Sequence, residues 1–358
     1  MLFLELLNAG NMIITEEARI DKIIIHKVGN KQLEEGLFIA NTTIDIKEEL
    51  KPALLNYLLS SFNSNEYYNF SHESDVQLNE AFSFTNSIFE NPGLFIEKSK
   101  NLAQHLYNCS LHPKVKEGEF YVVYFNQLII DGEEVDAIGL FKSEIKETFL
   151  KINQAGEGFA LQAEDGINLN KLQKGCLIFN SEHEKGFVLS IVDNLKKGNE
   201  AGYWKDAFLQ VRPREDDYFQ TKNVMTMYKD FVTEQLPAEF EISKADQADM
   251  MNKSMKFLNE KENFDIQDFE DEVIAQPEIK DSFKNYKQKY EEEKQVKINN
   301  DFEVSIPAVK KHQKTLKSVI KLDKNFHVYV HGNRQRIVKG YDESTGLNYY
   351  QLFFEEEK

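Results

Sequence analysis

The sequence predicts an α+β protein: a mainly antiparallel sheet with flanking helices, and a C-terminal helical segment that ends in a small β-meander. Three observations predict this class. Runs of β-branched and aromatic residues fill the middle of the chain, the loops between them are short, and stretches with apolar residues at three- and four-residue spacing lie on both sides. We therefore expect hairpins with packed helices rather than a parallel sheet.

The N-terminal third predicts two strands followed by three helices. The first strand is rich in β-branched residues and ends at Gly29-Asn30, which is typical of a turn. Pro52 is compatible with the first helix only in its first turn, and Asn91-Pro92-Gly93 ends the second helix before the third begins. The expected strands span 18–28 and 37–46, and the expected helices span 47–62, 78–89 and 95–111.

The middle of the chain predicts an antiparallel meander. Asp131-Gly132 is a hairpin turn signal between the first two strands, and the later connections are also short. The only tryptophan, Trp204, follows the meander and precedes a helix at 223–236, and Pro237 closes this unit of the chain. The expected strands span 119–130, 135–141, 148–152, 158–162, 176–180 and 186–193.

Helix start signals dominate the next hundred residues. Ser243 and Asp246 have the spacing of a capping pair, Asp265 can cap a second helix, and Pro277 can begin a third. We expect the Met and Tyr side chains of these helices to form core rather than a ligand site, because they lie at helical spacing with other apolar residues. The expected helices span 243–258, 266–274 and 277–290.

The strongest charge feature lies near the C-terminus. Residues 308–340 hold nine basic side chains against one acidic, a net +8, whereas residues 260–303 hold 14 acidic and 7 basic side chains. Basic residues can neutralise DNA phosphates, and Phe326, Tyr329 and Tyr341 add stacking surface between them. A solvated face paired with the acidic stretch is an equally favoured interpretation. The candidate DNA-binding residues are Lys310, Lys311, Lys314, Lys317, Lys321, Lys324, Arg334, Arg336 and Lys339.

Two local structures compete for residues 305–322. A continuous helix would place the lysines at 310, 314, 317 and 321 along one face, but the alternation that begins at Lys317 indicates a hairpin. We favour a short helix to about Thr315, followed by the small β-meander. Both interpretations leave the lysines exposed.

Composition limits the classes of function. The net charge is −17, so the chain outside 308–340 carries −25 and repels nucleic acid and anionic membranes at long range. Cys109 and Cys176 match no metal-ligand spacing and indicate free thiols in a reducing compartment. The apolar N-terminus lacks the basic region of a signal peptide, and no window is long enough to span a bilayer. We therefore expect a cytoplasmic protein without a membrane partner.

No complete catalytic motif occurs, so we expect no enzyme, no cofactor and no metal. The sharpest enzymatic hypothesis is a metal-dependent nuclease that uses Asp136, Glu144 and Lys146, because carboxylates bind Mg²⁺ while a lysine polarises the attacking water or the phosphate. Glu-x-Lys arises readily by chance in a chain with 29% charged residues. The competing interpretation is a hairpin edge charged for solubility.

Longer segments carry a family resemblance. They include Arg19-Ile-Asp-Lys-Ile-Ile-Ile-His-Lys-Val-Gly-Asn, Gly118-Glu-Phe-Tyr-Val-Val-Tyr-Phe, Val135-Asp-Ala-Ile-Gly-Leu-Phe-Lys-Ser-Glu and Ser243-Lys-Ala-Asp-Gln-Ala-Asp. From about Met12 to the C-terminus the sequence resembles the bacterial nucleoid-associated protein family of the NdpA or YejK type. The resemblance implies that residues 1–11 are an upstream extension, which we expect to be disordered. With the boundary at Pro237, we expect an α+β core domain at 12–237 and a C-terminal region at 238–358, with helices to about 315 and then the β-meander.

The resemblance also implies a place at the nucleoid and a link to type II topoisomerases, and it implies no catalytic residues. Our leading hypothesis is a non-enzymatic protein that binds DNA weakly and without sequence specificity through the basic segment. It could also, or instead, bind a DNA topology enzyme such as topoisomerase IV. The alternatives are the nuclease and an interaction protein without direct DNA contact. A homo-oligomer held by the aromatic-rich middle is a further expectation.

Overall fold

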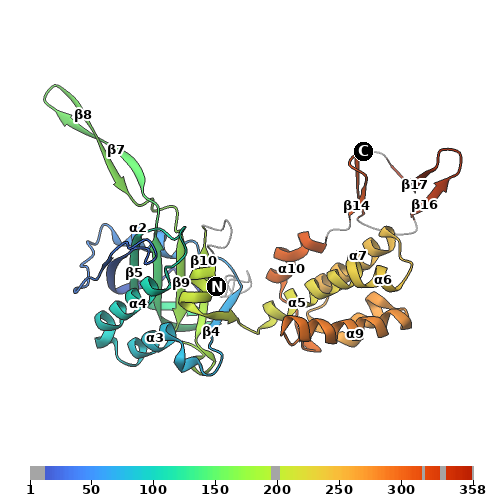
Figure 1. The fold of residues 1–358 in the computed structure, drawn as a ribbon, viewed down its shortest axis with the longest axis horizontal. Coiled ribbons are helices and arrows are strands. Elements are labelled where there is room, and N and C mark those ends of the chain that lie inside the picture. The colour runs from blue at the N-terminus through green and yellow to red at the C-terminus, as the bar shows by residue number, and fades with distance from the viewer. Residues whose placement is uncertain (1–12, 195–201, 317–318, 331–335, 357–358) are drawn as a thin grey trace. The chain divides into compact units, whose positions relative to one another are not determined.

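The structure, a computed structural model, describes residues 13–194, 202–316, 319–330 and 336–356 (Figure 1). The expected disordered extension at 1–11 lies outside the described residues. The chain forms two compact units, Met1–Arg214 and Glu215–Lys358. This division precedes the boundary expected at Pro237, because the helix before Pro237 contributes its apolar side chains to the core of the second unit.

The first unit contains an antiparallel sheet of nine strands in the described part of the chain. Strands β5, β6, β9 and β10 form the expected meander, β2 pairs with the outer side of β5, and β4 pairs with the far side of β10. The strands of this sheet are β1 (Ile13–Ile14), β2 (Arg19–Val28), β3 (Leu37–Phe38), β4 (Tyr67–Phe70), β5 (Gly118–Ile130), β6 (Glu133–Ser143), β9 (Lys174–Phe179), β10 (Val188–Asp193) and β11 (Val211–Pro213).

Both faces of this sheet are buried. Ile24, Val122 and Leu140 face a core built with α3, α4 and the π-helix η5, whereas Val123 and Phe141 face a second core built with α2. Neighbouring residues of one strand belong to opposite cores because side chains alternate along a strand. The helical segments are α2 (Lys51–Leu59), η1 (Val76–Leu78), α3 (Glu80–Glu90), η2 (Pro92–Leu94), α4 (Phe95–Cys109), η3 (His183–Lys185) and η5 (Tyr203–Leu209).

Two of the expected meander strands leave the sheet. Strands β7 (Glu147–Ala155) and β8 (Gly158–Gly166) pair only with each other, and Figure 1 shows them as a hairpin that projects from the body of the unit. The sheet has no place for them, because β6 pairs directly with β9 from Ala137–Phe179 to Lys142–Lys174. The expectation that residues 148–152 and 158–162 belong to the meander is therefore wrong.

The edges of the first unit also differ from expectation. Only Leu37–Phe38 of the expected strand at 37–46 pairs with β2, and the backbone beyond it is irregular apart from the amide of Ile44, which donates to the Ile23 carbonyl at 2.9 Å. Strand β4 was not expected, because its four residues are too few to show a pattern. Pro52 lies in the first turn of α2, as expected.

The second unit is mainly helical. The Ser243 hydroxyl accepts from the Asp246 amide, and the Asp246 carboxylate accepts from the Ser243 amide, so the expected capping box opens α7. Asp265 and Pro277 begin the next two helical segments, as expected. The elements are α5 (Asp217–Asp230), η6 (Phe231–Gln235), α6 (Leu236–Glu239), α7 (Lys244–Glu260), β12 (Asn263–Asp265), α8 (Ile266–Phe269), η7 (Glu270–Ile274), α9 (Pro277–Lys294), β13 (Asp301–Glu303), α10 (Ile306–His312) and η8 (Gln313–Leu316).

These helices share one apolar core. Met251, Phe283 and Tyr290 are buried in it, so the Met and Tyr stripes are core, as expected. Helix α5 continues through η6 into α6 and passes Pro237, which occupies the first turn of α6 instead of ending the helix. No helix in the described ranges is long and apolar enough to cross a membrane.

Two separate hairpins complete the second unit where a connected meander was expected. Strands β14 (Val319–Leu322) and β15 (Phe326–Tyr329) form the first hairpin, and β16 (Ile337–Asp342) and β17 (Leu347–Leu352) form the second. Ile320 and Ile337 pack with Ala245 and Ala248 of α7 in a small cluster of their own. This cluster attaches the hairpins to the helical core.

Candidate nucleic-acid interface

The basic segment spans three kinds of local structure in the second unit. Lys310 and Lys311 lie in the last turn of α10, Lys314 lies in the 3-10 turn η8, and Lys321 lies on β14. The helix ends at His312 rather than continuing, which agrees with the interpretation that we favoured. The lysines at 310, 314 and 321 therefore do not share one helix face, because the helix ends before most of them.

The described basic side chains are exposed, and most of them have no acidic partner. Among the described residues no ion pair reaches the lysine ammonium groups at 310, 314, 321, 324 and 339. Arg336 forms an ion pair with Glu355, and Lys311 lies over the ring of Tyr218 at 5.6 Å. Lys317 and Arg334 lie outside the described residues. The exposed lysines remain available to an anionic partner.

Lysines of the acidic stretch at 260–303 pair with carboxylates of the same stretch, which keeps a net charge of −7. Lys261 pairs with Glu272, Lys284 with Glu270, and Lys289 with Glu293. Lys289 and Glu293 lie one helical turn apart on α9, whereas the other two pairs connect η7 to Lys261 and to α9. In the described part of the chain this pattern favours lysines at 310, 314, 321, 324 and 339 that are open to another partner, over a face that is paired with the acidic stretch.

Aromatic side chains lie beside these cations on the two C-terminal hairpins. Tyr329, Tyr341 and Phe326 are between 57% and 64% exposed. On β16 and β17 the ring of Tyr349 covers Gly340, where an added Cβ would lie 2.3 Å from the ring. The hairpins therefore present cations and exposed rings together, which is typical of surfaces that bind nucleic acid without reading its sequence.

The residues of the nuclease hypothesis do not form one site. Asp136 accepts hydrogen bonds from the Tyr124 hydroxyl at 2.8 Å and from the Asn126 amide at 2.9 Å. Glu144 follows the other end of the same strand, about 25 Å away at the rise of a β-strand. Lys146 pairs with Glu119 at 2.7 Å. This separation prevents the two carboxylates from sharing one metal ion, and no cluster of three potential metal ligands occurs in the described ranges.

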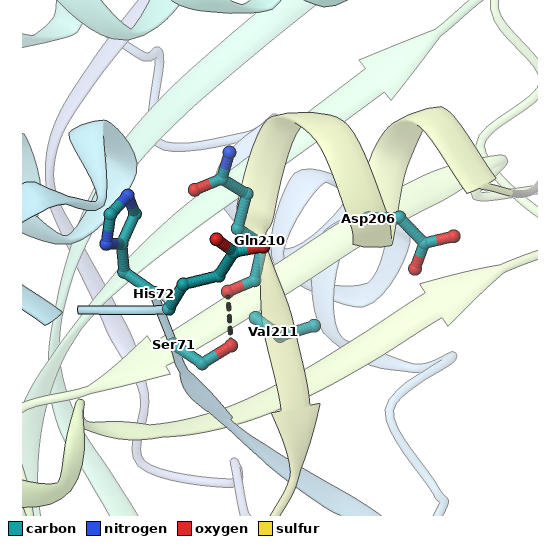
Figure 2. A pocket seen from close by; sticks show the side chains of 6 residues that line it. Ser71, His72, Asp206, Gln210 and Val211 are labelled. Carbon is teal, nitrogen blue, oxygen red and sulfur yellow. Dashed lines mark hydrogen bonds between the residues drawn. The ribbon is translucent and has the colours of Figure 1, made fainter. Parts of the chain in front are cut away.

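A hollow of about 530 Å³ lies beside the end of β4, and it lacks a catalytic arrangement (Figure 2). The Ser71 hydroxyl donates to the Gln210 carbonyl at 3.1 Å, and the His72 ring accepts from the Ser74 amide at 3.2 Å. Both groups are thus engaged with backbone atoms rather than with each other. Glu73 and Asp206 also line the hollow, so its charge disfavours phosphate.

A buried charged network in the first unit was not expected from the sequence. Lys142 donates to Glu144 at 3.2 Å and to the Lys116 carbonyl, and Tyr203 donates to the same carboxylate at 2.6 Å. Burial, and then the nearby charge of Lys174, lowers the pKa of Lys142. Burial, and then Glu144, raises the pKa of Tyr203.

No sequence signal marks this network, because its members are spread along the chain. Lys174 donates to Asp193 at 3.0 Å next to the Lys142–Glu144 pair, and both lysines also lie against the ring of Tyr203. The donors are directed at partners inside the protein. We interpret the network as a structural support at the end of β6, where the β7–β8 hairpin begins.

The comparisons identify the family. The family model described as nucleoid-associated protein YejK matches residues 24–346. The chain belongs to this family. A search of curated proteins found no match. The YejK-family match confirms the resemblance found in the sequence, spans parts of both units, and includes the basic lysines from 310 to 339. It supports a nucleoid-associated role.

Proposed function

We propose that this YejK-family chain is a non-enzymatic nucleoid-associated protein that contacts the DNA backbone, weakly and without sequence preference, through its exposed C-terminal lysines. The observation that carries the proposal is the set of lysines at 310, 314, 321, 324 and 339, which are exposed and lack acidic partners in the described part of the chain. Point charges on an irregular surface suit phosphates, which are the same in every DNA sequence.

The strength of binding follows from the charge balance. The −25 that the chain carries outside 308–340 opposes the approach of DNA, so the contact is weak and depends on low salt. If about six phosphates are neutralised, affinity falls about 10³-fold between 50 and 200 mM salt. Two duplexes of unrelated sequence should give the same curve of affinity against salt concentration.

The decisive test is a charge reversal with a matched control. The variant Lys310→Glu, Lys314→Glu, Lys321→Glu, Lys324→Glu should abolish binding to a short duplex in fluorescence anisotropy at 50 mM salt. The control variant reverses four other exposed lysines, at 47, 185, 256 and 289, and has the same net charge. Equal loss of affinity in both variants would show that net charge, and not this surface, governs binding.

A second candidate function is an interaction protein that reaches DNA through a partner such as topoisomerase IV. The strongly acidic remainder of the chain favours this route. The purified protein would then show no binding to DNA at low salt. It would still retain topoisomerase IV in a pull-down after nuclease treatment. Loss of the enzyme on nuclease treatment would instead indicate that DNA bridges the two proteins.

A further inference from the structure

The β7–β8 hairpin has one apolar face and one polar face. Ile152 pairs with Leu161, and Leu150 and Phe159 lie two residues from them on the same side of the ribbon. These four side chains are between 60% and 77% exposed. On the opposite face, Lys151 forms an ion pair with Glu164 at 3.1 Å, and Phe149 is the one large apolar side chain. The hairpin therefore has the pattern of a half-buried ribbon without the layer that would cover it.

This exposure is not explained by the first unit itself. Every residue from Thr148 to Asp165 is exposed, and neither strand pairs with the main sheet. Each strand has nine residues, which extend about 30 Å. A lone two-stranded hairpin is marginally stable in water, and apolar patches of this size mark interaction sites.

The base of the hairpin is firmly held. Glu147 accepts from the Lys171 ammonium at 2.6 Å and from the Asn168 amide at 2.8 Å. The Gln173 side chain accepts from the amides of Glu144 and Ile145, and Glu144 is a member of the buried lysine network. These bonds hold the two segments at the base of the hairpin together, so less conformational entropy is lost there when its apolar face is covered.

The chemistry of the face identifies its partner. Lys151 is the only cation between residues 147 and 166 and lies on the other face, so nucleic acid is a poor fit. The four apolar side chains, at about 100 Å² each, supply about 800 Å² in a pair of hairpins, and flanking residues bring the total close to the ~1,000 Å² of a specific interface. Each copy of the chain offers a strip of matching length and apolar character.

We propose that the β7–β8 hairpin binds the same hairpin of a second copy, apolar face against apolar face, and so forms a two-fold symmetric dimer. Identical faces that meet in this way form a closed interface. The uncharged strip lets two strongly acidic chains meet without bringing like charges into contact at its centre. The inference is independent of DNA contact by the second unit.

The test compares two charge substitutions on adjacent cross-strand pairs of the full chain. Ile152→Glu with Leu161→Glu places two carboxylates on the apolar face. Asn153→Glu with Ala160→Glu places two carboxylates on the polar face, one residue away, and also puts them directly opposite each other. Both variants have the same charge and the same local repulsion, so they differ only in the face that is altered.

Sedimentation velocity between 1 and 100 μM measures the result. We expect a dimer for the unaltered chain, a dissociation constant that rises at least about 100-fold for the apolar-face variant, and a dissociation constant that changes within about threefold for the polar-face variant. Urea unfolding at a protein concentration low enough to keep all three chains monomeric, followed by the fluorescence of Trp204 in the body of the unit, should be the same for all three. A monomer throughout, or a dimer that survives the apolar-face substitutions, would overturn the proposal.

Discussion

At the scale of single residues, His26 shows how a buried side chain couples stability to pH. The Ala40 amide donates to its Nδ1 at 3.1 Å, and its Nε2 lies 3.2 Å from the Ser99 hydroxyl. Protonation would direct an N–H of the ring at an amide that is itself a donor. Burial, and then the charge of Lys100, lowers the pKa of His26 to about 4.

This shift predicts a loss of stability in mild acid. Between pH 6.5 and about 4 the unfolded chain binds a proton at His26 that the folded chain does not, so stability decreases as the pH falls through this window, by an amount on the order of 2 kcal/mol. Urea unfolding of the first unit at several pH values, followed by Trp204 fluorescence, measures how steeply its free energy of unfolding changes with pH. His26→Gln should flatten this slope, and an unchanged slope in this variant would assign the effect to other groups.

At the scale of elements, local chemistry sets where helices begin, and tertiary contacts set how far strands extend. The capping box of Ser243 and Asp246 was recognisable in the sequence because all of its atoms lie within four residues. The separation of the β7–β8 hairpin from the sheet was not recognisable in the sequence. A strand that projects into solvent and a strand inside a sheet show the same alternation of apolar and polar residues.

The capping box gives a prediction for α7. Ser243→Ala removes the acceptor for the Asp246 amide and should lower the free energy of unfolding of the second unit by about 1 kcal/mol. Ser243→Asn keeps an acceptor and should lower it by only a few tenths of a kcal/mol. Urea unfolding of residues 215–358, followed by circular dichroism, measures both. Equal destabilisation by Ala and Asn would mean that packing, and not capping, explains the effect.

At the scale of the whole molecule, the apolar clusters of the two units are separate, which indicates two folding units. The apolar clusters of the first unit end at Val211, and those of the second begin at Val224. Neither unit completes its core with side chains of the other in these clusters. We therefore predict that residues 12–214 and residues 215–358 each unfold cooperatively when produced alone.

The fragment experiment also locates the proposed functions. The fragment 12–214 should keep the stability of the full chain within about 1 kcal/mol by Trp204 fluorescence and should retain the β7–β8 dimer. The fragment 215–358 should retain the salt-dependent binding to DNA. A fragment without a cooperative transition would show that the two cores depend on each other.

The sequence by itself determined the α+β class, most helix starts, the place of the basic segment and the family. These features depend on local patterns: caps such as Asp265, turn residues, the spacing of apolar residues, and a count of charges within 33 residues. They can be read without knowing what lies nearby in space. The end of α10 at His312 also agreed with the preference for a hairpin after it.

Only the tertiary structure decided which residues meet. It separated Asp136 from Glu144 along one extended strand, assembled Lys142, Glu144 and Tyr203 from distant segments, and left the apolar face of the β7–β8 hairpin uncovered. Pairing between strands and burial of charges depend on contacts far apart in the chain, where no local spacing predicts the partner. The candidate site therefore came from charge in the sequence, and the exposure of its described lysines came from the fold.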